Sequence, residues 1–493
     1  MILRDVFAEL PTATFLGNDS VDVLGVQMNS NQIEPGDLFV AIHGAKNDGH
    51  DFIHQAIERG AVAVWCETPP SNIQVPCVHS KNIREHVGRI AAKIYEEPTK
   101  HMTVIGVTGT NGKTTVCHLI EAILKFAAFD TAYLGTTDYR WKDVSLGSDR
   151  TTPEATELQR MFRRMRGDGV THVAMECSSH GIELGRLNGI EFDVAVFTNL
   201  TQDHLDFHGD MATYAQTKEK LFTVLLANGS KKSRTAVYNL DDPYGQKAFA
   251  EYRGEKIGFS LQESEEALVY AEKYTLSAFG TELEVIVGDK KAVFRCPLVG
   301  RYNVSNILAA IAATYALQVP LEQIVHALAE FENVPGRMEK VPTSSDVTVI
   351  VDYAHTDDAM KNVLSTLRPI CEGKLIVVFG CGGDRDKTKR PKMMKVVEQY
   401  ADTVVVTIDN PRTENPSSIV ADIMAGHDAG LNKQVVTILD RQEAIEQGIA
   451  FASGKDIVII TGKGHETYQE VQGRKIPFDD RAIAKAFLDR SVN

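Results

Sequence analysis

Residues 106–115 read GVTGTNGKTT, a glycine-rich segment that ends in one lysine and two threonines. The residues before it, 102–107, are apolar and rich in β-branched side chains, whereas residues 114–128 have helical periodicity. Glycines at such a strand-to-helix junction allow a tight turn, and the amides and dipole of the helix N-terminus stabilise a bound anion. We therefore predict a phosphate-binding loop for a nucleoside triphosphate.

Two residues of this loop have specific predicted roles. Lys113 is placed to reach the β- and γ-phosphates, and Thr114 is placed to bind Mg²⁺. The segment departs from the common pattern at one point, because Val107 stands where a glycine is usual. A glycine-rich segment is often only a turn, but the lysine and threonine at this junction favour the phosphate site.

Length, charge and cysteine content narrow the class of protein. A chain of 493 residues is too long for one core and predicts about three domains. The 52 basic and 66 acidic residues give a net charge of −14, which argues against nucleic acid or an anionic membrane as the main partner. The seven cysteines are scattered without a C-x-x-C pair, so we expect reduced, mostly buried thiols. With no signal-like N-terminus and no apolar stretch of about 20 residues, we expect a cytoplasmic protein without membrane insertion.

The order of strand-like and helix-like segments divides the chain into three blocks, 1–98, 99–334 and 335–493. EEPTKH at 96–101 and PGR at 335–337 mark the boundaries, because both segments favour turns. The predicted strands are 37–42, 61–65, 75–79, 102–107, 170–175, 192–197, a hairpin at 281–296, 347–351, 374–379, 403–407, 435–439 and 456–461. The predicted helices are 50–59, a segment ending at 95, 114–128, 304–317 and 321–331. Strands that alternate with helices predict parallel sheets and an α/β fold.

Polar residues follow the predicted strands of the second block. Glu176 ends one strand and is a candidate second ligand of Mg²⁺, although a lone glutamate at a strand end is more often solvated. His204 and His208 are four residues apart, which would place both imidazoles on one helix face. A transition-metal site and magnesium–phosphate chemistry are both open here, and the lack of an HExxH pattern favours the second. Lys218 lies among helix-forming residues, where an exposed lysine is the simple interpretation.

Three strand ends of the third block carry charged or glycine-rich segments. They read GCGGDRDKTKRP at 380–391, DNPRTENP at 409–416 and TGKGHETYQ at 461–469. Arg412 is suited to clamp a carboxylate bidentately, whereas Asp409 and Glu466 are suited to receive an ammonium group. Each segment alone could be a loop ion pair, but three at successive strand ends favour a zwitterionic ligand such as an amino acid.

Together these motifs resemble those of the Mur ligases, the ATP-dependent amide ligases of peptidoglycan precursor synthesis, over essentially the full chain. The shared segments are GVTGTNGKTT, TTPEATELQ, MECSSHGIELGR, NLTQDHLDFHG, YAQTKEKLF, GRYNVSNILAA, VPGRME, VDYAH, GCGGDRDKTKRP, DNPRTENP and TGKGHETYQ, in family order. The resemblance implies a three-domain α/β architecture. Its parts are an N-terminal UDP-sugar-binding domain, a central P-loop ATPase-like parallel sheet that binds ATP, and a C-terminal Rossmann-like domain that binds the amino acid.

Within the family, the chain is most similar to the ligases that add a diamino acid to UDP-N-acetylmuramoyl-L-alanyl-D-glutamate. The DNPR form of the 409–416 segment resembles the enzymes that use meso-diaminopimelate, whereas those that use L-lysine usually lack the arginine. The second carboxylate of diaminopimelate is a physical reason for Arg412. The alternatives are an L-lysine-adding ligase, a paralogue with another carboxylate or amine substrate, and a nucleotide-binding regulator without ligase activity.

The resemblance also implies roles for individual residues. The catalytic residues would be Lys113, His204 and Lys218. The magnesium ligands would be Thr114, Glu176 and Lys218 as a carbamate, which reverses the interpretation of Lys218 as an exposed lysine. The ATP-binding residues would be Gly109, Thr110, Asn111, Gly112, Lys113, Thr114, Thr115, Asn303, Arg337, Asp352, Tyr353 and His355. The residues for the UDP-sugar dipeptide would be Ser30, Thr151, Thr152, Ser178 and Arg186. The residues for the diamino acid would be Arg385, Asp409, Asn410, Pro411, Arg412, Gly462 and Glu466.

The implied reaction proceeds through an acyl phosphate. The D-glutamate carboxylate attacks the γ-phosphate of ATP, and the neutral amine then attacks the activated carbonyl, which leaves an amide, ADP and phosphate. Closure of the third domain would exclude water. We expect a monomer that uses ATP and Mg²⁺.

Several positions depart from the family pattern. Asn29 and Asn31 flank Ser30 where Asp-Ser-Arg is usual, and Arg150 replaces an asparagine before the two threonines. Cys177 replaces a valine, and Asp357 stands where a proline is usual. Either the first substrate differs, or these are tolerated substitutions in the same enzyme.

Overall fold

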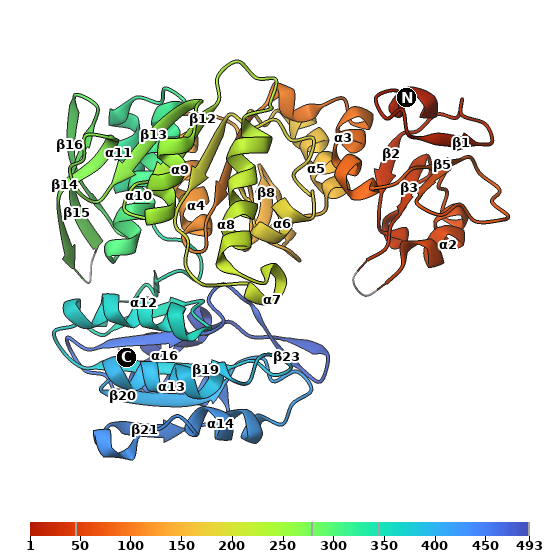
Figure 1. The fold of residues 1–493 in the computed structure, drawn as a ribbon. Helices are drawn as coiled ribbons and strands as arrows, with labels where there is room; N and C mark the ends of the chain where they lie inside the picture. Colours follow the sequence, from red (N-terminus) through yellow and green to blue (C-terminus); the bar gives the residue numbers. More distant parts are fainter. Residues whose placement is uncertain (45–46, 278–279, 344, 492–493) are drawn as a thin grey trace. The chain divides into compact units, whose positions relative to one another are not determined.

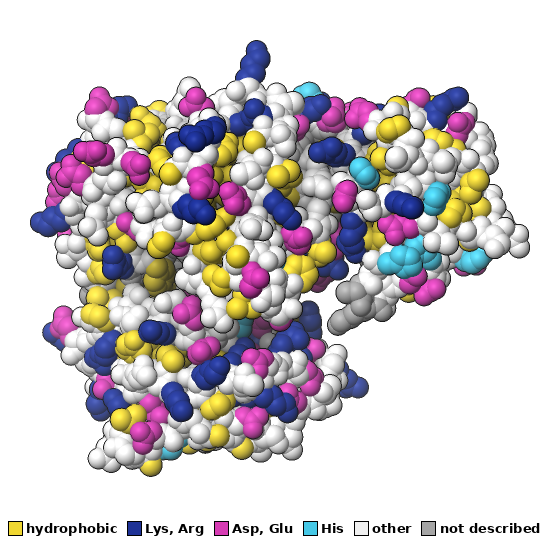
Figure 2. Space-filling model, viewed as in Figure 1, with side chains coloured by type: hydrophobic (Ala, Val, Ile, Leu, Met, Phe, Trp, Pro, Cys, Tyr) yellow, Lys and Arg dark blue, Asp and Glu magenta, His cyan; other side chains and the backbone are white. Residues whose placement is uncertain are grey.

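The computed structural model describes residues 1–44, 47–277, 280–343 and 345–491 (Figure 1). The chain forms two compact units, each described by itself below. Unit 1 comprises Met1–Glu272, Val285–Ala292 and Ser305–Leu328. Unit 2 comprises Lys273–Glu284, Val293–Val304 and Ala329–Asn493. No helix among the described residues is long and apolar enough to cross a membrane. Figure 2 shows acidic and basic side chains interspersed over the visible surface.

The first sheet of unit 1 has five strands in the order β1-β5-β4-β3-β2. Only β1 is antiparallel to its neighbour. The strands are β1 (Thr14–Leu16), β2 (Gly25–Gln27), β3 (Asp37–Ala41), β4 (Ala63–Cys66) and β5 (Cys77–His79). The helices are α1 (Leu3–Val6), η1 (Ser30–Gln32), η2 (Gly49–Phe52), α2 (Ile53–Glu58), α3 (Ile83–Ile94) and η3 (Pro98–His101). Strands β3 and β4 are buried throughout, because helices or loops cover both faces of a parallel sheet.

The second sheet has eleven strands in the order β16-β15-β14-β13-β12-β11-β6-β10-β7-β8-β9. Its middle, from β7 to β14, is parallel, and β7, β8 and β9 pair antiparallel at one edge. The strands are β6 (Thr103–Thr108), β7 (Thr131–Leu134), β8 (Asp138–Trp141), β9 (Val144–Gly147), β10 (His172–Glu176), β11 (Val194–Phe197), β12 (Thr235–Asn239), β13 (Glu255–Ser260), β14 (Ala267–Ser277), β15 (Gly280–Val287) and β16 (Lys290–Cys296). Strands β14 to β16 carry residues of both units.

The helices that accompany this sheet begin with α4, which follows the phosphate loop directly. They are α4 (Lys113–Phe126), α5 (Ala155–Gly167), α6 (Ser179–Glu183), α7 (Leu205–His208), α8 (Met211–Lys220), η4 (Leu221–Leu226), α9 (Pro243–Glu251), α10 (Arg301–Ala316) and α11 (Leu321–Ala329). Ten of the fourteen side chains of α4 are buried, so this helix lies in the core rather than on the surface.

Unit 2 contains a six-stranded sheet in the order β17-β18-β22-β19-β20-β21, parallel except at β17. Its strands are β17 (Glu339–Lys340), β18 (Thr348–Asp352), β19 (Leu375–Cys381), β20 (Thr403–Ile408), β21 (Gln434–Thr437) and β22 (Ile457–Thr461), and a separate hairpin is formed by β23 (Tyr468–Val471) and β24 (Arg474–Pro477). Its helices are α12 (Asp357–Leu367), η5 (Arg368–Ile370), α13 (Lys389–Tyr400), α14 (Pro416–Met424), η6 (Ala429–Leu431), α15 (Arg441–Ala450) and α16 (Asp480–Ser491). Strands β18, β19 and β22 are completely buried, which explains their continuous apolar sequences.

The structure confirms most predicted elements and adds several. The strand predicted at 102–107 is β6 and the helix predicted at 114–128 is α4, with ends within two residues. The seven cysteines are free and buried, as expected. The sequence did not predict the antiparallel strands β8 and β9 or the hairpin β23–β24, because these short segments carry mixed polar and apolar residues.

Candidate active site

The phosphate loop lies at the carboxyl ends of three adjacent strands of unit 1. Strand β6 ends at Thr108, and its neighbours β10 and β11 end at Glu176 and Phe197. Because β10 and β11 lie on opposite sides of β6, the strand order switches direction at this edge. Ligands of open α/β sheets bind at such a switch point. The fold therefore brings residues 109–115, Glu176 and the segment 198–204 to one edge of the sheet.

At two positions of the loop the backbone conformation and the close surroundings require glycine. Gly109 has a φ of +145°, and a Cβ built on it would lie 1.9 Å from Thr198 Oγ1. Gly112 has a φ of +88° and precedes α4, and its Cβ would lie 2.4 Å from Asn306 Oδ1. The turn from β6 into α4 thus depends on glycine at both positions.

We expect Gly109→Ala to weaken ATP binding by at least about tenfold, because the new methyl group must displace Thr198 and strain the backbone. Isothermal titration calorimetry of each variant with ATP measures the dissociation constant. Gly167→Ala is the matched control, since nothing lies within 4 Å of a Cβ at the end of α5. Equal affinity of the wild type and Gly109→Ala would place the ATP site elsewhere.

Two lysine side chains meet at the carbonyl oxygen of Gly109. Lys113 Nζ donates to Gly109 O at 3.0 Å and to Thr110 O at 2.9 Å, and Lys218 Nζ donates to Gly109 O at 2.9 Å. Lys218 comes from α8 and is 1% exposed, so its interpretation as an exposed lysine is wrong. Burial, followed by the charge of Lys113, lowers the pKa of Lys218 well below its usual value. The loop therefore has a buried amine with a depressed pKa beside it.

Glu176 is held by hydrogen bonds at the end of β10. Its Oε1 accepts from Tyr133 Oη and Thr136 N, both at 2.8 Å, and its Oε2 accepts from Thr136 Oγ1 at 3.1 Å. The residue is 1% exposed, which excludes the solvated glutamate considered above. Oε2 accepts fewer hydrogen bonds than a carboxylate oxygen can, so it keeps capacity for a cation. Together with the buried hydroxyl of Thr114, these oxygens are the ligand types that Mg²⁺ takes.

Three imidazoles gather beside the loop. His204 has a left-handed backbone with a φ of +54°, and α7 begins only at the next residue. The prediction that His204 and His208 share a helix face is therefore wrong. Instead, the His180 ring lies 4.9 Å from His204 and 5.7 Å from His208, measured between ring centres. Burial lowers the pKa of all three imidazoles, that of His180 to about 4. The cluster is therefore neutral at pH 7, as suits a hydrogen-bonding role rather than a charged one.

Four of the residues predicted for the dipeptide lie together next to Glu176. Thr152 Oγ1 donates to Glu176 O at 2.9 Å and accepts from Ser178 N at 3.0 Å, and Arg186 Nη1 donates to Thr152 O at 3.0 Å. Thr151 Oγ1 lies 3.1 Å from the Thr136 hydroxyl that also contacts Glu176. Strand β10 and the loop before α5 thus form one hydrogen-bonded surface.

Ser30 is placed separately, in η1 after β2, where its Oγ donates to Gln55 Oε1 at 2.7 Å. The neighbouring departures from the family pattern have local roles. Asn29 Oδ1 accepts from Asn31 N at 3.0 Å and caps η1, and Asn31 Oδ1 accepts from Gln55 Nε2 at 3.3 Å. Both asparagines therefore stabilise this turn.

Five predicted ATP residues belong to unit 2, and one of them is the buried acid Asp352. It ends β18, and its carboxylate accepts from Met338 N at 2.7 Å and from Ala354 N at 2.8 Å. Burial raises the pKa of Asp352, while Arg337 and the two amides oppose that rise. The carboxylate thus fixes the backbone on both sides of the strand end.

An aromatic group and a guanidinium surround that strand end. Arg337 Cζ lies 4.6 Å from the centre of the Tyr353 ring, and the His355 ring lies 4.7 Å from the same ring. Asn303, also in unit 2, donates from its side-chain amide to the carbonyl of Val299 at 2.8 Å. A planar ring next to a guanidinium is suited to contact a purine base.

The predicted amino-acid site lies at the ends of β20 and β22. Asn410 Nδ2 donates to Glu466 Oε2 at 2.9 Å. Gly462 has a φ of +114°, and a Cβ there would lie 2.8 Å from Asp409 Oδ2. Lys463, which the sequence did not single out, is completely buried, and its Nζ donates to Asn410 Oδ1 and to Glu466 Oε2, each at 3.0 Å. The predicted residues Asp409, Asn410, Gly462 and Glu466 therefore form one cluster with a buried lysine.

Arg412 lies beside this cluster with a left-handed backbone of φ +51°. Its Nε donates to Glu470 Oε2 at 2.9 Å and its Nη1 donates to Gly383 O at 2.7 Å. Both bonds fix the plane of the guanidinium, and Nη2, which makes no hydrogen bond with the described residues, can contact a carboxylate. Pro411 precedes Arg412, while Arg385 is exposed and, within the described residues, donates to the carbonyl of Asp384 at 3.4 Å.

A buried ion pair supports the same strand ends, and sequence reasoning missed it. Arg441 and Asp480 are both fully buried, with Nε to Oδ1 at 2.9 Å and Nη2 to Oδ2 at 2.7 Å. Arg441 also donates to Ile408 O at 3.1 Å and to Thr461 O at 2.9 Å, which are the last residues of β20 and β22. Arg441 and Asp480 are the first residues of α15 and α16. In a sequence, a charged residue at the start of a helix indicates a helix cap or an exposed ion pair, so no local pattern could have revealed this buried contact.

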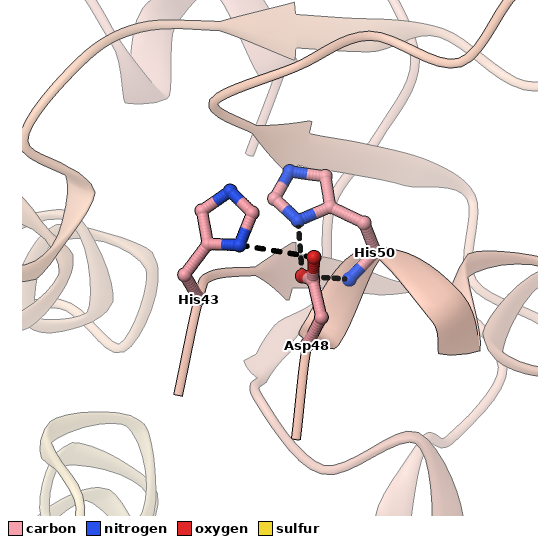
Figure 3. A group of neighbouring side chains, drawn as sticks. All are labelled: His43, Asp48 and His50. Carbon is pink, nitrogen blue, oxygen red and sulfur yellow. Dashed lines mark hydrogen bonds and ion pairs between the residues drawn. The ribbon is translucent and has the colours of Figure 1, made fainter. Parts of the chain in front are cut away.

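A second group of polar side chains lies in the first sheet region (Figure 3). The carboxylate of Asp48 contacts His43 Nδ1 at 2.9 Å and His50 Nδ1 at 2.6 Å. The spacing of the three ligand atoms would suit a metal ion. However, Thr68 N donates to His50 Nε2 at 3.3 Å, so Nδ1 carries the proton of the neutral ring and donates to Asp48. A metal ion bound to His50 Nδ1 would require the loss of that proton or of the hydrogen bond from Thr68. A turn held by hydrogen bonds to Asp48 therefore explains these three side chains better than a metal site does.

Three family models match most of the chain. The model of the Mur ligase family, catalytic domain, matches residues 22–98, the Mur ligase middle domain matches residues 107–314, and the Mur ligase, glutamate ligase domain, matches residues 336–464. A curated protein of Coxiella burnetii named UDP-N-acetylmuramoyl-L-alanyl-D-glutamate--2,6-diaminopimelate ligase is 41% identical over 481 residues, covering 95% of this chain and 96% of that protein. A protein of the same name from Geobacillus thermodenitrificans is 42% identical over 487 residues, covering 99% of both.

A solved structure with that name is also similar. It has a TM-score of 0.73 and 31% sequence identity, and the match covers 100% of this chain and 99% of that one. The structure of a MurF ligase from Thermotoga maritima in complex with ADP has a TM-score of 0.63 at 19% identity, which is a likeness of fold alone.

Proposed function

The chain belongs to the Mur ligase family, and we propose that it uses ATP to add meso-diaminopimelate to UDP-N-acetylmuramoyl-L-alanyl-D-glutamate. The names of its curated relatives, which are 2,6-diaminopimelate ligases of this nucleotide-sugar dipeptide, support the choice of substrates. The reaction forms an amide through an acyl phosphate and serves peptidoglycan precursor synthesis. The observation that carries this proposal is the meeting of Lys113, Lys218 and Gly109 O next to Glu176 at the switch point of the large sheet. A nucleotide-binding regulator would not need that second buried lysine.

The residues of the loop would act by electrostatics. Lys113 would bind the γ-phosphate and stabilise the charge that develops as it is transferred to the D-glutamate carboxylate. Thr114, Glu176 and a carbamate on Lys218 would hold magnesium, which when bound neutralises phosphate charge. Carbon dioxide adds only to a neutral amine, and the depressed pKa of Lys218 favours that form. The neutral His204 would donate or accept a hydrogen bond at the same place.

The remaining predicted residues would divide the substrates among them. Thr151, Thr152, Ser178 and Arg186 would bind the dipeptide, and Ser30 the uridine side. Arg337, Tyr353 and His355, with Asn303 and Asp352, would contact the nucleotide. We further propose three domains, 1–98, 99–334 and 335–493, in a monomer that works in the cytoplasm.

Phosphate release in the presence of ATP, magnesium and UDP-N-acetylmuramoyl-L-alanyl-D-glutamate tests the proposal. We expect kcat/KM for meso-diaminopimelate to exceed that for L-lysine by about 10- to 100-fold, because the second carboxylate gains a charge-assisted bond to Arg412. Preference for lysine would overturn the role of Arg412 alone. No release with either amine would refute this substrate pair and point to a paralogue, for which Arg150, directly before Thr151, is a candidate cause.

The matched pair Arg412→Ala and Arg385→Ala separates the two arginines of this region. We expect Arg412→Ala to lose the preference for diaminopimelate over lysine, and Arg385→Ala to keep it, because only Arg412 is held in one orientation by Glu470 and Gly383. The same assay measures both. Retention of the full preference by Arg412→Ala would contradict the assignment.

A further inference from the structure

Lys463 lies inside the cluster at the ends of β20 and β22, yet its position differs from that of a ligand-binding lysine. The side chain is 0% exposed. Nζ donates to Asn410 Oδ1 and Glu466 Oε2 at 3.0 Å each, and it lies 3.6 Å from Asp409 Oδ1. A buried ammonium is costly unless charged acceptors surround it, and here two carboxylates and an amide do so.

The two carboxylates around Lys463 are not equally satisfied. Glu466 Oε2 accepts from both Lys463 Nζ and Asn410 Nδ2. Asp409 Oδ1 is buried and accepts no hydrogen bond within the described parts of the chain, and its nearest cation is Lys463 at 3.6 Å. A buried acceptor without a donor is unfavourable, so it is suited to receive a donor from a ligand.

We propose that Lys463 is a positioning residue of the amino-acid site. Its ammonium holds the Glu466 carboxylate and the Asn410 amide in one arrangement, and thereby leaves Asp409 Oδ1 to accept from the ammonium group of the amine substrate. The charges support this division of roles. Asp409 and Glu466 carry two negative charges, Lys463 cancels one, and the substrate ammonium cancels the other. This inference rests on the proposed function, since it concerns the amine substrate of that reaction.

The aromatic ring next to Lys463 provides a matched control. Lys463 Nζ lies 5.5 Å from the centre of the Tyr468 ring, and Lys475 Nζ lies 4.2 Å from the same centre. Lys475 is exposed on β24 and contacts neither Asp409 nor Glu466 through a hydrogen bond or ion pair in the described residues. Removal of its charge therefore tests the surroundings of Tyr468 without touching the carboxylate cluster.

The test is the KM of each substrate for Lys463→Met, Lys475→Met and the wild type. We expect Lys463→Met to raise the KM of diaminopimelate at least about tenfold and to change the KM of ATP less than twofold, whereas Lys475→Met changes neither. A shared rise in both KM values, or an unchanged KM of diaminopimelate, would overturn the proposal. If Lys463→Met does not fold, Lys463→Gln, which keeps a donor but no charge, must show the same selective rise.

A double variant shows whether Lys463 acts through Glu466. If it does, Glu466→Gln combined with Lys463→Met raises the KM of diaminopimelate little beyond the larger single effect. A multiplicative effect would mean that Lys463 acts independently of Glu466 and would overturn the positioning role. Failure of the proposed function is distinct, because the wild type itself would then release no phosphate with diaminopimelate.

Discussion

Lys218→Ala is expected to reduce turnover by about 10²- to 10³-fold or more, with little change in thermal stability. The variant removes the amine that would carry the carbamate, and a preorganised charge at a transferring phosphoryl group contributes on this scale. Steady-state phosphate release measures the loss. Lys220→Ala is the matched control, because Lys220 lies on the same helix but is 45% exposed and pairs with Glu183 at the surface.

Dissolved carbon dioxide provides the second part of this test. Enzyme that has been kept at low pH and freed of carbon dioxide should regain activity when bicarbonate is added, and mass spectrometry or ¹³C NMR should detect the labelled carbamate on Lys218. The pKa of Lys218 is depressed by burial and by Lys113, so the neutral amine needed for this addition is favoured as pH rises toward neutrality. Full activity of Lys218→Ala would exclude the carbamate from the mechanism.

Arg441→Met is expected to destabilise unit 2 by about 3–5 kcal/mol, because it leaves the Asp480 carboxylate buried without its partner. The substitution also removes the donors to Ile408 O and Thr461 O. Hydrogen–deuterium exchange of β20, β22 and α15 measures the effect locally, and 3–5 kcal/mol corresponds to exchange that is faster by roughly 10²- to 4 × 10³-fold.

The surface pair between the same helices is the control for this variant. Arg490 Nη2 lies 2.8 Å from Glu446 Oε1, and the two side chains are 66% and 27% exposed. Arg490→Met should change stability by less than about 1 kcal/mol. Equal exchange in Arg441→Met and Arg490→Met would show that the buried pair contributes no more than an exposed one.

The fold was largely predictable because its sheets are parallel and buried. Continuous apolar segments such as 102–107 and 374–379 alternate with helical periodicity, and the structure has β6 and β19 at these places. The α/β class and its Mur ligase architecture are therefore confirmed. The short antiparallel strands β8, β9, β23 and β24 were missed because their register depends on partners that no local pattern reveals.

The candidate site was predictable only where residues follow strand ends. Glu176 ends β10, Asp409 directly follows β20, and Glu466 lies in the loop after β22. Parallel strands bring those ends together. Lys218 and Lys463 were not distinguished by local sequence, because a lysine in a helix or a glycine-rich loop is normally exposed. Their burial involves contacts with residues distant in the sequence, of Lys218 with Gly109 and of Lys463 with Asn410.

The strand order of unit 2 also determines when its sheet can form during synthesis. Fully buried β22 pairs with β18 on one side and with β19 on the other, although it follows both in the chain. Until β22 leaves the ribosome, the sheet consists of two separate parts. One part is β17 with β18, the other is β19 to β21, and the strand that joins them, β22, is missing. Their apolar edges stay open, which slows folding and favours aggregation. Interrupted synthesis before Ile457 should therefore yield a nascent chain that depends on chaperones.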